Sequence, residues 1–162
     1  MALSGWRNAT VPNTSRAIQN EGARTIKGLV DADNAANMQP GRGVISPATA
    51  VAETAKAIEE TGYMPTPAER TLLNRVNNAS FLTLDEAVKL RSTIGNAASK
   101  AERTGNVKGA KVLWTNYDEL GKAAGERATE VGGPDGTKAW AHYNNEFKAY
   151  FELNKGIAGE MQ

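Results

Sequence analysis

The sequence predicts an all-α protein, a bundle or set of helical hairpins of about five helices with an extended N-terminal arm. Three observations lead to this prediction. Helix-initiation signals recur from Ser46 onward, turn residues separate them, and the apolar residues between them follow helical spacing. No sustained alternation of apolar and polar residues is present, so we expect no β-sheet.

Residues 1–45 are expected to form an N-terminal arm that is partly extended and contains one weak helix. The helix is expected from Ser15 to Asn37. Its apolar residues are sparse, and Gly22 and Gly28 each cost about 1 kcal/mol relative to alanine. A helix of this kind needs a partner surface, whereas residues 46–162 are expected to form a bundle domain of their own.

Three helix starts in the first half of the bundle domain carry a hydroxyl N-cap. Ser46 precedes Pro47, which suits the first position of a helix. Thr66 and Thr83 are each followed by a glutamate three residues later, which completes a capping box. The expected ends of these helices are Gly62, Asn77–Asn78 and Thr104–Asn106.

Two further helices are expected, and the last one is rich in aromatic residues. The fourth should run from about Lys108 to Thr129 and end at Val131–Pro134, and the fifth should begin near Thr137 and end at Gly156 and Gly159. Together with Trp6 in the arm, the aromatic residues of the fifth helix are candidate interface residues: Trp140, Tyr143, Phe147, Tyr150 and Phe151. The alternative is that Trp140, Tyr143 and Phe147 are core residues, while Tyr150 and Phe151 lie near an exposed helix end.

The residue types present exclude several kinds of catalytic or metal site. The chain has no cysteine, which excludes disulfides, zinc–thiolate sites, iron–sulfur clusters and cysteine nucleophiles. The single histidine, His142, has no second ligand near it and is expected at the surface. The segment starting at Asp31 begins like a calcium loop, but Ala36 and Arg42 stand where glycine and glutamate are needed. We therefore expect no catalytic residue, metal or cofactor, no small-molecule substrate and no enzymatic activity.

Charge and hydropathy limit the classes of partner that we expect for this chain. Lys+Arg (19) nearly cancels Asp+Glu (18) and no basic run is present, so nucleic-acid contact, if made, is not expected to be sequence-specific. No apolar run reaches the roughly 18 residues of a membrane-spanning helix.

Arg91 lies on the apolar side of its predicted helix, where it should pair with a carboxylate or stack on an aromatic ring such as Trp114. The spacing of Gly121 and Gly125 predicts a close helix crossing.

Three stretches resemble a helical pattern of tailed-bacteriophage virion proteins, especially internal or ejected ones. The stretches are Leu84–Gly95 (LDEAVKLRSTIG), Tyr117–Leu120 and Ala139–Tyr150, and the resemblance covers about residues 46–160. The chain lacks the lytic-transglycosylase or protease segment of long members, so the resemblance implies no cell-wall-degrading activity.

The resemblance implies a structural virion component that self-assembles through helix faces. Its partners would be further copies of the chain or other virion proteins. Its location would be the virion and, during assembly, the host bacterial cytoplasm. The alternative hypothesis is a helical adaptor or chaperone-like module that binds another protein through a groove or a helix face.

Overall fold

The computed structural model describes the backbone of residues 11–37 and 43–161, and the side chains of residues 24–37, 43–148 and 151. Within these residues the chain forms five helices: α2 (Val11–Ala36), α3 (Ala48–Thr61), α4 (Pro67–Asn77), α5 (Leu84–Arg103) and α6 (Val107–Met161). The predicted all-α fold is therefore confirmed. A single antiparallel bridge between Ile45 and Leu82 is the only β pairing among the described residues. Among the described helices, none combines the length and the apolar character needed to span a membrane.

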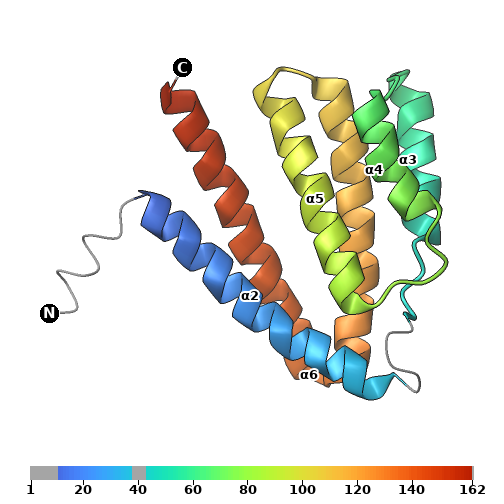
Figure 1. The fold of residues 1–162 in the computed structure, drawn as a ribbon, viewed down its shortest axis with the longest axis vertical. Coiled ribbons are helices and arrows are strands. Elements are labelled where there is room, and N and C mark those ends of the chain that lie inside the picture. Colours follow the sequence, from blue (N-terminus) through green and yellow to red (C-terminus); the bar gives the residue numbers. More distant parts are fainter. Residues whose placement is uncertain (1–10, 38–42, 162) are drawn as a thin grey trace, which may run out of the picture.

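Helix α6 folds back on itself and forms a helical hairpin. Gly133 leaves the helical conformation (φ 61°, ψ −146°) and Pro134 follows it, a pair that favours a sharp break because glycine tolerates positive φ and proline lacks an N–H. We call residues 107–132 the first limb and residues 134–161 the second limb. Gly136 lets the limbs meet closely, since a Cβ there would lie 2.0 Å from the carbonyl oxygen of Ala128. Figure 1 shows the two limbs diverging from this turn.

The local helix signals predicted most boundaries correctly. Thr66 and Thr83 form complete capping boxes, and Gly62 ends α3 in the left-handed conformation with φ 68°. Pro47, however, is not the first helical residue. Helix α3 begins one residue later, and the Ser46 hydroxyl accepts a hydrogen bond from the backbone N–H of Ala48 at 3.2 Å.

The end of the last helix was predicted wrongly. Gly156 and Gly159 do not end it, because α6 continues to Met161. Glycine lowers helix stability by only about 1 kcal/mol, so neighbouring residues can carry a helix through it. The predicted break at Val131–Pro134 is present, but as the kink between the limbs and not as a loop between separate helices.

Helix α2 is longer than predicted and begins at Val11 instead of Ser15. It packs against α6, and Figure 1 shows it running beside the second limb from the end of the molecule where α6 turns. Among the described side chains of this helix, Leu29 is the buried apolar one, which agrees with the expectation that this helix needs a partner surface. The first ten residues of the expected arm, Trp6 among them, lie outside the described residues.

The hydrophobic core lies mainly between α5 and α6. Leu84 and Ile94 of α5 and Leu113 and Leu120 of the first limb are fully buried. Helices α3 and α4 cover the other side of this pair, as Figure 1 shows. The second limb and α2 lie at the opposite side, where they diverge from the remaining helices (Figure 1).

Candidate functional site

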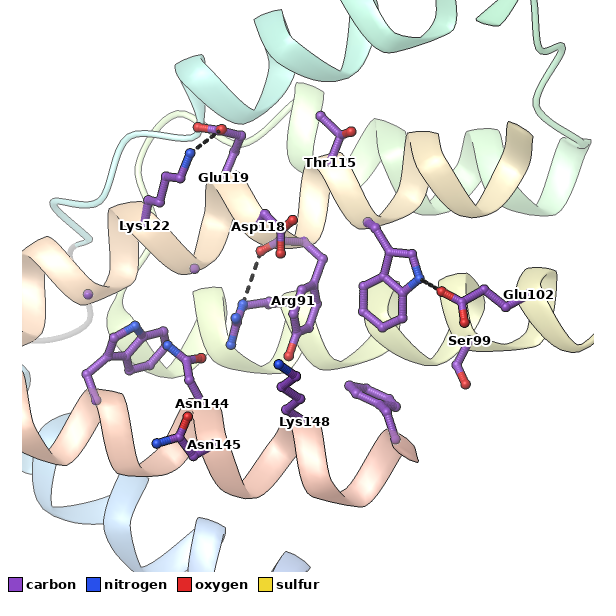
Figure 2. A pocket seen from close by; sticks show the side chains of 16 residues that line it. Arg91, Ser99, Glu102, Thr115, Asp118, Glu119, Lys122, Asn144, Asn145 and Lys148 are labelled. Atoms are coloured by element: carbon purple, nitrogen blue, oxygen red, sulfur yellow. Dashed lines mark hydrogen bonds and ion pairs between the residues drawn. The ribbon is translucent and has the colours of Figure 1, made fainter. Parts of the chain in front are cut away.

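A groove of about 880 Å³ runs between α5 and the two limbs of α6. Figure 2 shows its three walls, each contributed by one helix segment. Helix α5 contributes residues between 91 and 102, the first limb residues between 114 and 125, and the second limb residues between 140 and 151. The groove therefore exists because Gly133 and Pro134 fold α6 into a hairpin whose limbs diverge over α5.

Arg91 lies at the floor of the groove with its guanidinium held between aromatic rings. Its side chain is buried, and its Nε donates a hydrogen bond to the carbonyl oxygen of Tyr117 at 3.1 Å. The guanidinium carbon is 3.8 Å from the ring centroid of Tyr117 and 5.3 Å from that of Trp140, which are cation–π distances. The prediction that Arg91 stacks on an aromatic ring is confirmed, although the rings are not that of Trp114.

The two glycines of the first limb make room for these side chains. A Cβ on Gly121 would lie 2.7 Å from Nη2 of Arg91, and a Cβ on Gly125 would lie 2.8 Å from the indole of Trp140. Their spacing predicted a close helix crossing, but the space beside these glycines is filled by a guanidinium and an indole. Any larger side chain at either position would push Arg91 or Trp140 out of place.

Electrostatics in the groove centre on Arg91 and Asp118. Burial lowers the pKa of the Arg91 guanidinium, and the nearby Asp118 carboxylate opposes this shift. Burial likewise raises the pKa of Asp118, which the positive charges of Arg91 and Lys122 partly offset. Figure 2 shows Asp118 directed toward Arg91, while Lys122 pairs with Glu119 at 3.0 Å. The charge of Arg91 is thus largely offset by Asp118, and that of Lys122 by Glu119.

Aromatic rings form a continuous line from the floor of the groove to its far end. Trp114 packs edge-on against Tyr117 and Phe151, with centroid distances of 5.0 and 5.4 Å, and Phe151 packs against Phe147 at 5.6 Å. The Trp114 indole also donates a hydrogen bond to Glu102 of α5. These contacts fix the second limb relative to α5 and the first limb.

The candidate interface residues lie deeper than a surface patch would require. Trp140, Tyr143 and Phe151 are only 7%, 3% and 8% exposed to solvent. Trp140 and Tyr143 are therefore core residues, and Phe147 is partly buried against the same core. The expectation that Phe151 lies at an exposed helix end was wrong, because the diverging limb still brings its ring onto Trp114. Trp6 and the side chain of Tyr150 lie outside the described residues, and an interface formed by these aromatic residues stays a prediction.

The rim on the second limb carries polar groups whose hydrogen-bonding capacity is not used. The side-chain oxygen of Asn144 is buried and accepts no hydrogen bond. Lys148 is exposed and makes no ion pair or hydrogen bond within the described part of the chain. The Asn144 oxygen is out of reach of a partner, whereas the exposed ammonium group of Lys148 can pair with an acidic group of a binding partner.

A second polar cluster, at the turn end of the bundle, joins three helices. Oδ1 of Asp33 accepts a hydrogen bond from Nε of Arg127 at 2.6 Å, and Oδ2 accepts one from the backbone N–H of Leu84 at 3.0 Å. Arg127 also donates to Glu130 at 2.6 Å and to Asn37 at 3.1 Å. Sequence reasoning missed this cluster, because its members are far apart in the chain and each has an ordinary local context.

The cluster is structural, since its charges are used in mutual contacts. The side chains of Asp33 and Arg127 are 1% and 8% exposed, so their charges face each other in the interior. The described residues contain no group of three potential ligands for a metal ion. His142 is exposed, as predicted, with Nε2 3.8 Å from Oε1 of Glu146.

The groove is lined by aromatic and charged side chains. Tryptophan, tyrosine and arginine are the residues that contribute most to binding energy at interfaces, and here they line one elongated hollow with a polar rim. Comparison with known proteins yields no match to a protein-family model, a curated protein or a solved structure. The function is therefore inferred from the groove and from the residues that form it.

Proposed function

We propose that this chain is a non-enzymatic structural component of a bacteriophage particle, an internal, ejection or tail-associated protein that acts by helix-mediated self-assembly. The observation that carries the proposal is the convergence of three distant stretches of sequence. The stretches that resemble tailed-bacteriophage virion proteins lie on α5, the first limb and the second limb. Each supplies one residue to the floor of the same groove, and these residues are Arg91, Tyr117 and Trp140.

The groove gives this role a physical basis. Its aromatic rings and its buried guanidinium supply the kind of rigid, amphipathic surface that binds helices with little loss of side-chain entropy. The partners are further copies of this chain or other virion proteins. The protein resides in the virion and, during assembly, in the cytoplasm of the host bacterium.

Mass spectrometry of purified particles tests the proposal. Particles from the phage or prophage that encodes the chain should contain it in many copies, and Lys148→Glu at the groove rim should lower the copy number. Thr93→Glu is the matched control, because Thr93 is an exposed residue of α5 that does not line the groove. Particles that lack the wild-type chain would overturn the proposal.

A helical adaptor or chaperone-like module is the second candidate. The exposed and unpaired Lys148 favours it, because an acidic group of a partner protein would pair with this residue. Mass spectrometry of purified particles and of complexes from infected cells separates the two functions. An adaptor would be recovered from infected cells in a stoichiometric complex with one other protein and would be absent from finished particles.

A further inference from the structure

Helix α2 lies at the edge of the molecule, beside the second limb (Figure 1). Among its described side chains, residues 24–36, only Leu29 and Asp33 are buried, and Ile26 and Val30 are partly buried. Helix α5, in contrast, buries nine of its 20 residues. Because the burial of apolar surface is what keeps a helix on its bundle, this part of α2 can separate from the bundle at a lower cost than α5 can.

The surface that receives α2 is made by α5 and α6. Among the described helices, α2 contacts these two and neither α3 nor α4. Leu29 approaches the end of the first limb, since a Cβ on Gly132 would lie 4.0 Å from its Cδ2. Asp33 accepts hydrogen bonds from Nε of Arg127 at 2.6 Å and from the N–H of Leu84 at 3.0 Å. A second copy of the chain presents the same surface.

The buried carboxylate of Asp33 determines which partner can receive this helix. Asp33 is 1% exposed, so its charge has to face a cation and hydrogen-bond donors wherever the helix binds. Arg127 and the N–H of Leu84 supply them here. An apolar surface of an unrelated protein would leave the carboxylate buried without a partner. The surface of α5 and α6 in a second copy meets both requirements, because it is identical to the one that α2 already occupies.

The chain that joins α2 to the bundle is long enough for α2 to reach a neighbouring copy. Gly43 is anchored at the start of α5, where a Cβ on it would lie 2.1 Å from the carbonyl carbon of Leu82. Seven residues, 37–43, connect the end of α2 to this anchor. A fully extended chain of seven residues spans about 23–25 Å, which is about twice the diameter of a helix with its side chains.

We infer that α2 is exchanged between copies, so that α2 of one copy lies on α5 and α6 of a second copy, in the place of that copy's own α2. The Asp33–Arg127 pair and the hydrogen bond from Leu84 then form between the copies. Exchange in both directions gives a dimer and creates no new contact surface. The helix of the same copy competes at a high effective concentration, so exchange is favoured where copies are concentrated. This surface is separate from the groove, and the inference goes beyond the proposed function.

Two opposite charge reversals test the exchange. Asp33→Arg and Arg127→Asp each place like charges on α2 and α6 of one chain, so each variant alone loses the contact that holds α2. In a one-to-one mixture, exchange rebuilds one wild-type pair and one reversed pair. Sedimentation velocity should therefore show a heterodimer that is at least about tenfold tighter than the association of either variant alone. Both variants also carry Lys148→Glu at the groove rim, so that contacts through the groove contribute little. The matched control is one chain with both reversals, which rebuilds the pair within one copy and should associate like the Lys148→Glu chain.

Disulfide trapping tests the exchange without changing a charge. The chain has no cysteine, so Leu29→Cys and Gly132→Cys introduce one defined pair. One chain with both substitutions should close a disulfide within itself. The two single variants, mixed at high protein concentration and oxidised, should give a covalent heterodimer in non-reducing electrophoresis. The control mixture replaces Leu29→Cys by Asn34→Cys, at an exposed position of α2, and should give mainly monomer.

Each experiment has a result that overturns the inference. Charge variants that associate no more tightly in the mixture than separately would overturn it, and so would equal yields of covalent heterodimer in the two cysteine mixtures. Both experiments use the isolated chain. A chain that exchanges α2 but is absent from particles would therefore overturn only the proposed function, whereas a chain that is present in particles but does not exchange α2 would overturn this inference alone.

Discussion

Replacing Asp33 by alanine should strongly destabilise the folded protein. Asp33 is 1% exposed and accepts two hydrogen bonds, one from the Arg127 guanidinium at 2.6 Å and one from the N–H of Leu84 at 3.0 Å. The substitution leaves a buried cation without its buried counter-charge and a backbone N–H at the start of α5 without an acceptor.

The magnitude follows from these two losses. Removing one member of a buried ion pair costs about 3–5 kcal/mol, and an unsatisfied buried N–H costs about 1–3 kcal/mol, but the two overlap. Arg127 keeps Glu130 and Asn37 as partners, which limits the loss. We expect a decrease of about 3–5 kcal/mol in the free energy of unfolding, or about 6–20 °C in Tm for a chain of this size.

Urea denaturation of matched variants measures this effect. Asp31→Ala is the control on the same helix, because the Lys27–Asp31 pair has side chains that are 76% and 62% exposed, and such pairs contribute at most about 0.5 kcal/mol. The double variant Asp33→Ala with Arg127→Met should be more stable than Asp33→Ala alone, since it removes the uncompensated cation. Asp33→Ala within about 1 kcal/mol of Asp31→Ala would refute the reasoning.

The further predictions concern packing and protonation. Phe151→Ala should lower the free energy of unfolding by about 3–5 kcal/mol, and by more than Phe147→Ala does, because the Phe151 ring is buried and the Phe147 ring is only partly buried. Equal losses for the two variants in urea denaturation would contradict this. Gly28→Ala should raise stability by about 1 kcal/mol, since a Cβ there meets nothing within 4 Å. Gly121→Ala should lower stability by about 1–3 kcal/mol because its Cβ would lie 2.7 Å from a buried guanidinium; thermal unfolding that shows the same sign for both glycines would exclude this account. Burial raises the pKa of Tyr143 from 10.0 to about 12, so its contribution to stability is fully present below pH 10 and is lost as pH rises toward 12, by about 1–3 kcal/mol. Tyr143→Phe should flatten this loss in denaturation curves, and an unchanged slope would show that other groups cause it.

The sequence predicted the features that depend on local chemistry. The capping boxes at Thr66 and Thr83 and the left-handed Gly62 are determined by neighbours within a few residues, and all three are present. The break before Pro134 was also predicted, since glycine and proline act on their own backbone. The direction in which the chain turns at that break depends on contacts with α2 and α5, which no local pattern reveals.

The parts of the site that sequence reasoning missed depend on contacts between distant residues. Asp33 and Arg127 are separated by 94 positions, and nothing in either neighbourhood predicts that they meet. Phe151 was expected near an exposed helix end. The angle between the limbs brings its ring onto Trp114 instead, and no local sequence pattern determines that angle. Arg91 was the exception, because a lone arginine among apolar residues on one helix face is itself a signal of pairing or stacking.

Sedimentation velocity over a range of protein concentrations tests the central claim, that the chain assembles with itself through the groove, most directly. The wild-type chain should form species larger than a monomer as the concentration rises, and Lys148→Glu at the groove rim should weaken this association. Thr93→Glu, at an exposed position of α5 outside the groove, is the control and should associate like the wild type. A wild-type chain that stays monomeric at every concentration, or a Lys148→Glu variant that associates like the wild type, would contradict the claim.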